Sequence, residues 1–434
     1  NITLKNIQFV NATSKNVNYG GAITIKNNTN VLIDNCQFID NTKSSIYNDG
    51  TLTITNTYFL NNKDRVSDST NNILGGAIYN TGNLAVFNST FRENYAGSGG
   101  AIYNAGNLTV NSSTFRYNKA TNHGGSMIVA SIKNRKDGGR GGDICNFGNA
   151  TITNSTFKET QLIDLGARGG SIYNNGTMLL KQVEISNIAM ISDDPIGRHS
   201  VGTAIANIGN LTLEDSIIAN ITTHLTYQGR IQGAIQNEGL LTVTRTIFEN
   251  NKPDRLYGHQ LYYDIGSGNI YNTGAGILNI TSSVFFNENP NNLPTVAQDV
   301  AIMAGSAICL ENNSWSGEDP LTNNHIYGTL NVTKYWLISL EPDYSMLEIG
   351  EQTNITQTMK LMYEKHTVDY TQLPDLYVKF NVNGQNITKK LVDGKASVEF
   401  NQSDVKGSYV VTSTMSNIVK TADVDVGKEY SAMK

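Results

Sequence analysis

The chain has 434 residues, a length typical of two or three domains. Its 32 basic and 37 acidic residues give a net charge of −5, which excludes a protein that binds nucleic acid through a basic surface. Charged residues make up only 16%, below the roughly 25% of an average soluble domain. No apolar run approaches the roughly 18 residues of a membrane span, and the first residues lack the regions of a signal peptide. If the protein is secreted, its targeting segment has already been removed.

A four-residue element, mostly Tyr-Asn-x-Gly, recurs eight times between residues 47 and 274. Small residues precede it, as in Gly75-Gly76-Ala77-Ile78. An alternating strand that ends in an aromatic residue follows it, as in Leu108-Thr109-Val110 to Phe115. The aromatic ends are between 21 (Phe38 to Phe59) and 42 (Phe115 to Phe157) residues apart, and no long window has a helical period.

Each unit therefore holds two short strands, one tight corner and one variable loop. A single unit has one apolar edge that it cannot bury alone, whereas parallel stacking buries Leu, Ile, Val and Phe in continuous columns. We predict an all-β fold in which residues 1–330 form a right-handed parallel β-helix of about 10–11 coils. At about 4.8 Å per coil, this rod is roughly 50 Å long.

The asparagine at each corner is predicted to form a structural ladder. Its amide is expected to hydrogen-bond to the same asparagine in the coils above and below, and Asn tolerates a left-handed backbone. The glycine two residues later is expected to supply a further positive φ. The ladder consists of Asn48, Asn80, Asn104, Asn146, Asn174, Asn207, Asn237 and Asn272.

From about Tyr335 the pattern changes to longer alternating strands. Turn signals separate them at Asn383-Gly384, Asp393-Gly394 and Lys406-Gly407. This spacing predicts an immunoglobulin-like β-sandwich over residues 335–434, without the Cys-Trp-Cys signature of antibody domains. Residues 316–334 are expected to be a short, ordered linker.

Two sets of motifs resemble known families. The Gly-Gly-Ala-Ile and Phe-x-x-Asn elements, such as Phe91 to Asn94, resemble the repeats of polymorphic outer-membrane proteins. The run Asn312-Asn313-Ser314-Trp315, followed by Tyr335-Trp336-Leu337 and a sandwich, resembles the adhesin-like surface proteins of methanogenic archaea. Those proteins carry an Asn-Trp-Trp-Gly-like element here, whereas in this chain Ser314 replaces the first Trp and Ser316 precedes the glycine. The resemblance implies a secreted, cell-surface protein and names no receptor.

Asn-x-Ser/Thr sequons are abundant, which agrees with an extracellular glycoprotein. A chain this rich in Asn, Ser and Thr also generates sequons by chance, and an Asn that faces the core cannot carry a glycan. The candidate glycosylation sites are Asn11, Asn88, Asn107, Asn154, Asn210, Asn279, Asn331, Asn354 and Asn386.

Parallel β-helices also host polysaccharide lyases and hydrolases. Hydrolysis of a glycoside needs two carboxylates about 5–9.5 Å apart, which on a β-helix would come from matched strand positions. The acidic candidates all fall in predicted variable loops: Asp64 with Asp68, Asp137 with Asp143, Asp193 with Asp194, and Asp254 with Asp264. We therefore expect no catalytic residues and no enzyme, and keep a polysaccharide-active enzyme as the alternative.

The six histidines are dispersed, so we expect neither a metal site nor a cofactor. The three cysteines are interpreted as small, buried strand residues that are not linked to one another. Cys145 stands in the column of Tyr79 and Tyr103, Cys309 is expected in the same column, and Cys36 aligns with Ser89.

The variable loops are expected to emerge along one flank of the rod, where loops carry function. The longest are Asn61 to Leu74, Lys119 to Arg140, Ser186 to Val201 and Asn251 to Ser267. Aromatic and basic residues of the last one are able to stack on sugars or anchor a protein partner. Alternatively, these side chains fold back and cover the rod. The candidate partner-binding residues are Arg255, Tyr257, His259, Tyr262 and Tyr263.

The sequence thus favours an extracellular adhesin-like or surface-filament protein, a rigid rod that presents loops at the cell surface. Its expected partners are surface glycans or proteins. Residues 2–9 read as a coil whose first half is missing, which exposes apolar residues and unpaired strand edges. We expect other copies of the chain, or upstream coils of the same polypeptide, to cover this end. Alternatively, the first residues and a loop of the next coil fold over it.

Overall fold

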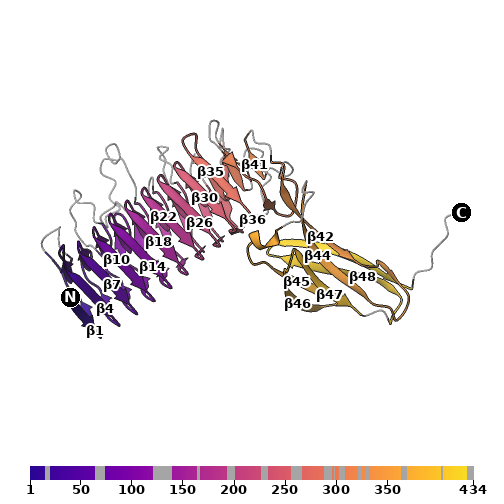
Figure 1. Ribbon diagram of the computed structural model, residues 1–434, viewed down its shortest axis with the longest axis horizontal. Helices are drawn as coiled ribbons and strands as arrows, with labels where there is room; N and C mark the ends of the chain where they lie inside the picture. Colours follow the sequence, from indigo (N-terminus) through magenta and orange to yellow (C-terminus); the bar gives the residue numbers. More distant parts are fainter. Residues whose placement is uncertain are drawn as a thin grey trace.

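The structure is a computed structural model that describes residues 1–14, 20–63, 74–120, 139–163, 167–192, 201–225, 233–255, 266–287, 296–297, 299–302, 308–320, 325–328, 332–362, 369–401 and 404–427. In these ranges the regular structure is β-strand apart from one 3-10 turn, η2 (Tyr370–Gln372). Figure 1 shows a rod of stacked coils, followed by a second group of strands at its C-terminal end.

Each coil of the rod passes through three sheets in a fixed order, and equivalent strands of successive coils pair in parallel. The register is strict: Leu84 lies beside Leu52 in one neighbouring coil and beside Leu108 in the other. The chain is therefore a parallel β-helix, as predicted. Its described residues form eleven coils, if the strands of sheet 1 are counted.

Sheet 1 consists of β1 (Ile2–Lys5), β4 (Asn30–Asp34), β7 (Thr51–Thr55), β10 (Asn83–Phe87), β14 (Asn107–Asn111), β18 (Asn149–Thr153), β22 (Thr177–Lys181), β26 (Asn210–Glu214), β30 (Leu240–Thr244), β35 (Ile277–Thr281) and β39 (Ile308–Cys309). Sheet 2 begins with β2 (Gln8–Val10), β5 (Gln37–Ile39), β8 (Tyr58–Leu60), β11 (Thr90–Arg92), β15 (Thr114–Arg116), β19 (Thr156–Lys158), β23 (Glu184–Ser186), β27 (Ile217–Ala219), β31 (Ile247–Glu249), β36 (Val284–Phe286) and β40 (Asn313–Trp315). Sheet 3 consists of β3 (Ile23–Ile25), β6 (Ile46–Asn48), β9 (Ile78–Asn80), β13 (Ile102–Asn104), β17 (Ile144–Asn146), β21 (Ile172–Asn174), β25 (Ile205–Asn207), β29 (Ile235–Asn237), β34 (Ile270–Asn272), β38 (Val300–Ile302) and β41 (Ile326–Tyr327).

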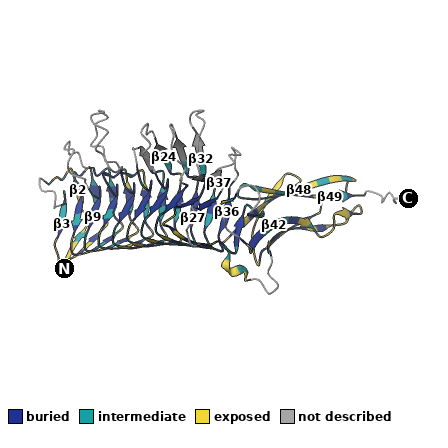
Figure 2. Ribbon diagram, turned by 90° about the horizontal axis from the view of Figure 1, so that it is seen from above, coloured by how far each residue is buried: buried dark blue, intermediate teal, exposed yellow. Residues whose placement is uncertain are grey.

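The interior of the rod is built from the period-two pattern of these strands. In β7, for example, Leu52 and Ile54 are buried while Thr51 is exposed. Figure 2 shows that the buried positions follow one another along the rod. Because equivalent residues stack, the aromatic ends of sheet 2 form a column of parallel rings with centroids 4.7–4.8 Å apart from Phe9 to Phe157. Trp315 ends a second such column, 4.6 Å from Phe285.

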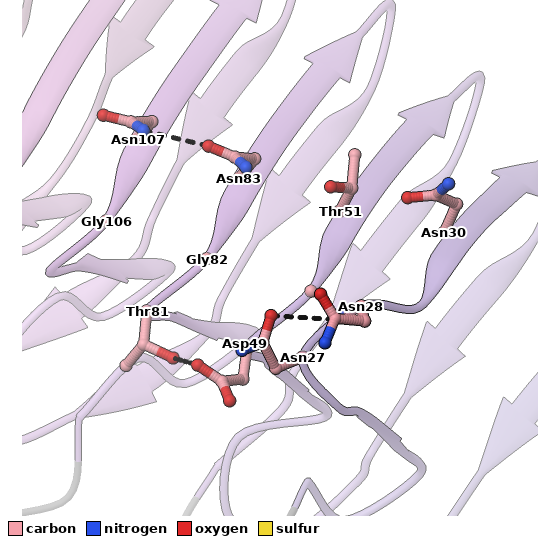
Figure 3. A pocket seen from close by; sticks show the side chains of 11 residues that line it. Asn27, Asn28, Asn30, Asp49, Thr51, Thr81, Gly82, Asn83, Gly106 and Asn107 are labelled. Atoms are coloured by element: carbon pink, nitrogen blue, oxygen red, sulfur yellow. Dashed lines mark hydrogen bonds between the residues drawn. The ribbon is translucent and has the colours of Figure 1, made fainter.

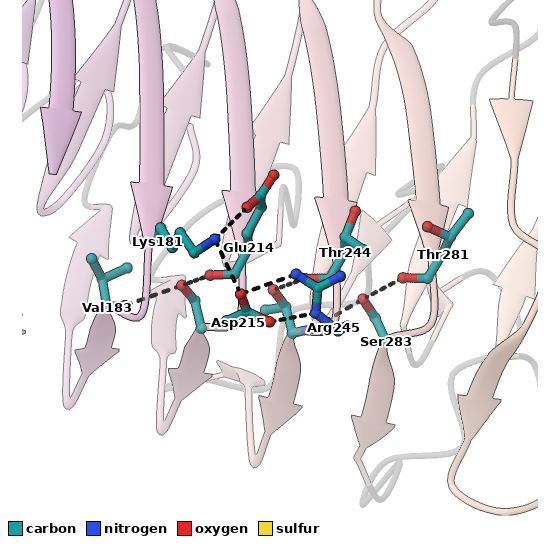
Figure 4. Close-up of polar contacts among 10 residues, drawn as sticks. Lys181, Val183, Glu214, Asp215, Thr244, Arg245, Thr281 and Ser283 are labelled. Atoms are coloured by element: carbon teal, nitrogen blue, oxygen red, sulfur yellow. Dashed lines mark hydrogen bonds and ion pairs between the residues drawn. The ribbon is translucent and has the colours of Figure 1, made fainter. Parts of the chain in front are cut away.

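The corner between sheets 1 and 2 is one of the places where the chain repeatedly adopts a left-handed backbone. Asn56 and Asn88 have positive φ there, and so do Asp215 and Arg245 in later coils. Arg245 and Asp215 form an ion pair across adjacent coils, with Nη2 to Oδ2 at 3.0 Å (Figure 4), and this contact lowers the pKa of Asp215. Asn is favoured at such corners because its short polar side chain tolerates this conformation.

The predicted left-handed backbone at the Asn-x-Gly corner is wrong. In the described residues, neither the ladder asparagines nor the glycines that follow them have positive φ. The glycine is required by close approach instead: a Cβ on Gly106 would lie 2.1 Å from the carbonyl oxygen of Gly82, and one on Gly148 would lie 2.0 Å from that of Gly106. Stacked backbones leave no room for a side chain at this column.

Replacement of Gly106 with alanine is therefore expected to destabilise the rod by about 2 kcal/mol, because a backbone carbonyl cannot move aside cheaply. The free energy of unfolding from denaturant titration measures this loss. The matched control is Gly407→Ala, since the nearest atom to a Cβ there is 3.7 Å away. Equal stability of the two variants would contradict the close-approach explanation.

Strands outside the three sheets lie in the segments between sheet 2 and sheet 3. They pair with one another from coil to coil, so parts of the predicted variable loops are regular. They are β12 (Tyr95–Ala96) with β16 (Lys119–Ala120), then β20 (Gln161–Ile163), β24 (Ala189–Ser192), β28 (Thr222–Leu225) and β32 (Lys252–Arg255), and β33 (Gly266–Ser267) with β37 (Val296–Ala297).

The C-terminal strands form two sheets around a shared core. The first continues sheet 2 through β42 (Tyr335–Pro342), β44 (Thr353–Leu361) and β47 (Lys395–Phe400). The second contains, in spatial order, β43 (Met346–Leu347), β49 (Ile418–Val426), β48 (Gly407–Met415), β45 (Tyr377–Val382) and β46 (Gln385–Lys390). The immunoglobulin-like assignment of this part stays a prediction.

The rod and the C-terminal strands are joined by a continuous sheet. β42 pairs in parallel with β40 of the last coil and in antiparallel with β44. Trp336 is buried and donates from Nε1 to the carbonyl oxygen of Asn312 at 3.0 Å. Val284 and Phe286, on the outer face of the rod, belong to the same apolar core as Trp336. The rod and the C-terminal strands therefore share a sheet and an apolar core next to the predicted boundary at residues 330–335.

Candidate binding site on the rod

A column of tyrosines lies on the outer face of sheet 3. In the repeated Ile-Tyr-Asn strand, the alternation turns Ile and Asn inward, so the tyrosine between them points outward. We call Tyr47, Tyr79 and Tyr103 the tyrosine column. Their ring centroids are 5.2 Å apart at each step, with neighbouring rings at 89° to each other, and all three are half-buried.

The aromatic surface continues into the next coils but becomes buried there. Cys145 takes the tyrosine position, and the ring of Phe147 lies 5.6 Å from that of Tyr103 and 5.8 Å from that of Tyr173. Tyr173 is buried beneath the guanidinium of Arg140, 5.3 Å from its ring centroid. The accessible part of this surface therefore ends near Phe147.

The phenols of Tyr79 and Tyr103 stay neutral across the physiological range. Burial raises the pKa of Tyr103 to about 12, with Cys145 and Tyr79 as further causes. Burial also raises the pKa of Tyr79. A neutral phenol both donates and accepts a hydrogen bond, so each of these rings combines an apolar face with a polar edge.

A polar groove lies over the corner between sheets 3 and 1, in coils that include those of the tyrosine column. Its cavity volume is about 650 Å³, and we call it the amide groove (Figure 3). Asn107 donates to Asn83 across one coil step, with Nδ2 to Oδ1 at 2.9 Å, and Thr81 donates from Oγ1 to Asp49 at 3.0 Å. The side chains that line it are those of Asn27, Asn28, Asn30, Asp49, Thr51, Thr81, Asn83 and Asn107.

The column and the groove belong to the same coils. Tyr79 is followed by Thr81 and Asn83 of the groove, Tyr47 by Asp49 and Thr51, and Tyr103 by Asn107. The first coil of the groove has Thr24 in place of a tyrosine. In three successive coils, a tyrosine on the outer face of sheet 3 thus lies within four residues of the amides, hydroxyls or carboxylate at the adjoining corner. The sequence analysis missed this arrangement, although the outward position of a residue between a buried Ile and a buried Asn was a readable signal.

The predicted ladder asparagines all lie inside the rod, next to this corner. Each Nδ2 donates to the Oδ1 of the next asparagine at 2.7–2.8 Å, from Asn48 through to Asn272. The same Nδ2 also donates to the carbonyl of the following glycine, as from Asn80 to Gly82 at 3.1 Å. The ladder thus fixes the corner that carries the groove.

A second buried ladder, which the sequence analysis missed, lies at the corner after sheet 2. It uses the asparagine of each Phe-x-x-Asn element: Asn62 donates to Asn94 at 2.8 Å, and Asn94 to Asn118 at 2.9 Å. Asn118 then donates to Asp143 Oδ1 at 2.8 Å. Recurrence of Asn three residues after each aromatic end was the available signal.

The predicted position of Asp143 in a variable loop is wrong. It directly precedes β17 and is fully buried, where Thr160 and Ser171 donate to its Oδ2 at 2.8 and 2.7 Å. Burial raises its pKa to about 6, against the effect of these hydrogen bonds. A carboxyl without access to solvent cannot meet a polymeric substrate, so Asp143 belongs to the scaffold.

A similar buried acid lies near the end of the rod. Asp299 accepts from Asn269 Nδ2 at 2.7 Å, and its other oxygen lies 2.7 Å from His325 Nδ1. Burial raises the pKa of Asp299, while the bond to His325 opposes this shift. Both side chains are buried, so this pair also extends the scaffold rather than a surface site.

The remaining acidic candidates and the predicted partner-binding loop are largely outside the described residues. For Asp254 and Arg255 the structure gives only the backbone, at the end of β32. The undescribed residues among these calls are Asp64, Asp68, Asp137, Asp193, Asp194, Asp264, Tyr257, His259, Tyr262 and Tyr263.

The sequons are distributed over the surface of the described chain. Asn331 lies outside the described residues, and Asn279 is half-buried in β35. Asn107 lines the amide groove. The sequon asparagines that are exposed are Asn11, Asn88, Asn107, Asn154, Asn210, Asn354 and Asn386.

The cysteines are unlinked, and two of the three occupy their predicted columns. Cys145 lies between Tyr103 and Tyr173, and burial raises the pKa of its thiol. The backbone N–H of Cys36 bonds to Thr57 in the hydroxyl column that contains Ser89. The placement of Cys309 is wrong: it lies in sheet 1 beside Asn279 and is exposed.

In the described part of the chain, no group of three or more His, Cys, Asp or Glu side chains is placed to hold a metal ion. The described ranges also contain no helix with the length and apolar character needed to cross a membrane.

Comparisons with known proteins give only weak similarities. No protein-family model matches the sequence, and no curated protein matches it. The chain is similar to the tailspike protein of E. coli bacteriophage HK620 in complex with pentasaccharide, at 10% identity and a TM-score of 0.25, over 94% of this chain and 84% of that one. A mutant of this tailspike gives 11% identity and a TM-score of 0.26, over 94% and 77%. We draw no functional argument from scores this low.

Proposed function

We propose that this chain is an extracellular, adhesin-like rod of the cell surface, and that it binds its ligand side-on through the tyrosine column and the amide groove. The observation that carries the proposal is the alignment of these two features along the same coils. Partly exposed tyrosines near polar side chains are typical of recognition surfaces, because each ring offers apolar area together with a hydroxyl.

The scaffold supports this proposal through its rigidity. Two buried ladders and a stacked aromatic column tie each coil to its neighbours, so the positions of the surface groups are fixed before a ligand arrives. Preorganisation of this kind reduces the entropy lost on binding. The seven exposed sequons are consistent with a glycoprotein at the cell surface.

The archaeal origin, the immunoglobulin-like stalk and the assembly of copies at the N-terminal end remain parts of the proposal that rest on the sequence. So does the absence of catalysis. Incubation with plant and microbial polysaccharides, followed by measurement of reducing ends or unsaturated products, tests that last point. Reproducible turnover would make the protein an enzyme.

Binding to intact microbial cells and to immobilised polysaccharides tests the proposed function. We expect the double variant Tyr79→Ala with Tyr103→Ala to lose binding about tenfold, as expected for removal of roughly 1.4 kcal/mol of contacts. The matched control is Tyr377→Ala, because this tyrosine is 57% exposed but lies in the C-terminal strands. Unchanged binding of the double variant, together with a loss for the control, would place the ligand site elsewhere.

A further inference from the structure

We infer that the ligand of this surface is a neutral, linear polysaccharide that lies parallel to the axis of the rod. The inference rests on the proposed function and specifies the chemical class and direction of the ligand. The direction of the repeat, the chemistry of the groove and the charge of the groove each support this inference separately.

The direction follows from the repeat. The groove crosses β4, β7, β10 and β14, which are consecutive in sheet 1, so its side chains recur once per coil at about 4.8 Å. The rings of the tyrosine column recur at 5.2 Å along the same direction. A polymer that runs along the axis meets an equivalent set of groups in every coil, whereas one that crosses the axis meets a single set. Only the first arrangement uses the whole surface.

The chemistry of the groove suits a ligand rich in hydroxyl groups. An amide such as that of Asn83 both donates and accepts, and so does the hydroxyl of Thr81, which matches the dual character of a sugar hydroxyl. The ring faces of the column match the apolar faces of sugar rings, and the phenols of Tyr79 and Tyr103 are neutral. The surface therefore offers partners for both sides of a sugar ring.

A peptide fits this surface less well. Extended peptides bind sheets by pairing their backbone N–H and C=O groups with a free strand edge. Here β7 and β10 are already paired with strands on both sides, so no backbone edge opens into the groove. A peptide would have to satisfy its regular backbone through side chains alone.

The charge of the groove favours neutral polysaccharides over acidic ones. Asp49 is the one charged residue among those that line the groove, and its Oδ1 already accepts from Thr81. A uronic-acid polymer would bring its carboxylates close to this negative charge. The exposed Lys26 directly precedes Asn27 but does not line the groove. The cations Arg140 and Arg168 lie in later coils, where Arg140 covers Tyr173 and Arg168 lies 3.7 Å from Glu238. The charge within the groove itself therefore favours an uncharged polymer.

Calorimetric titration with linear glucan oligosaccharides of increasing length, and with oligogalacturonates of the same lengths, tests the inference. For the glucans we expect affinity to rise with length until the oligosaccharide spans the groove and then to level off. The oligogalacturonates are expected to bind at least tenfold more weakly, and Asp49→Asn is expected to narrow this difference. Thr151→Ala, which changes an outward-facing residue of β18 beyond the groove, serves as the control.

The outcomes distinguish this inference from the proposed function. If the tyrosine double variant loses binding to cells but the wild-type chain binds no neutral glucan, or prefers galacturonate, the inference fails and the proposed function stands. Affinity that does not depend on length would overturn the axial arrangement. If the double variant binds cells and oligosaccharides as tightly as the wild type does, the proposed function itself fails.

Discussion

Replacement of Asn104 with leucine is expected to lower the free energy of unfolding by about 3 kcal/mol, although the two side chains have nearly the same size. Asn104 accepts from Asn80 at 2.7 Å and donates to Asn146 at 2.7 Å. It also donates to the carbonyl oxygens of Gly106 and Asn149 at 3.0 and 3.2 Å. Leucine makes none of these bonds, so the buried Oδ1 of Asn146 loses its ladder donor.

Denaturant titration of the two variants Asn104→Leu and Asn107→Leu isolates the contribution of the ladder. Asn107 is exposed at the start of β14, three residues after Asn104, so the same chemical change there is expected to alter stability by less than about 0.5 kcal/mol. Since Asn104 does not have positive φ, relief or creation of backbone strain does not enter the comparison. Equal midpoints for the two variants would rule out a stabilising role for the ladder.

The fold of the rod was predictable because its signals repeat. In each coil the alternation of Leu or Val with Thr or Asn marks which side chains face inward, and the aromatic residue marks the end of the second strand. An ambiguous assignment in one coil is resolved by the neighbouring coils, because a parallel stack places equivalent residues in one column. This is why Phe38, Phe59 and Phe91 are found stacked as the pattern indicates.

Less was predictable where one residue type serves two purposes. Asn and Gly are the residues of left-handed turns, but they also suit buried amide ladders and close backbone contacts. The sequence alone does not say which purpose applies at Asn104 and Gly106. Only the approach of Gly106 to the carbonyl of Gly82 decides it.

The last coils were predicted least well, because the segments between their strands vary in length. Cys309 was assigned to the column of Cys145, yet it lies in sheet 1. The tyrosine column was overlooked for a different reason: Tyr79 and Tyr103 recur with the repeat, so in the sequence they resemble the residues that build the scaffold. A binding surface that repeats with the fold is easily mistaken for part of the scaffold.

Asp143 is expected to make the rod less stable as the pH rises from about 4 to about 6. Its pKa is about 6 in the folded chain, against 3.8 for an ordinary aspartate, because burial disfavours the charged form. The folded state therefore binds the proton more tightly than the unfolded state. The stability that this provides is complete below the unfolded pKa and is lost as the pH passes through the folded pKa. A difference of about two pKa units corresponds to about 3 kcal/mol.

Asp143→Asn removes this charge and keeps the shape of the side chain. Its Oδ1 is able to accept from Asn118 as before, and its Nδ2 is able to donate to Thr160 or Ser171 once their hydroxyls rotate. The variant then extends the second ladder by one more asparagine. We expect it to be about 3 kcal/mol more stable than the wild type above pH 6 and to match it below pH 4.

The measurement is the difference in unfolding free energy between variant and wild type as a function of pH. This difference is used because Asp299 is also buried and has a raised pKa. Asp299 adds a pH dependence of the same sign to the stability of both proteins, and subtracting one free energy from the other removes it. Asp34 acts in the opposite direction, since hydrogen bonds from Asn56 and the nearby Lys5 and Thr55 hold its pKa at about 2, and it is likewise common to both. A difference that stays constant from pH 4 to pH 8 would show that Asp143 does not change its charge in this range. A variant that is less stable than the wild type at every pH would show that the carboxyl is needed for its hydrogen bonds, whatever its charge.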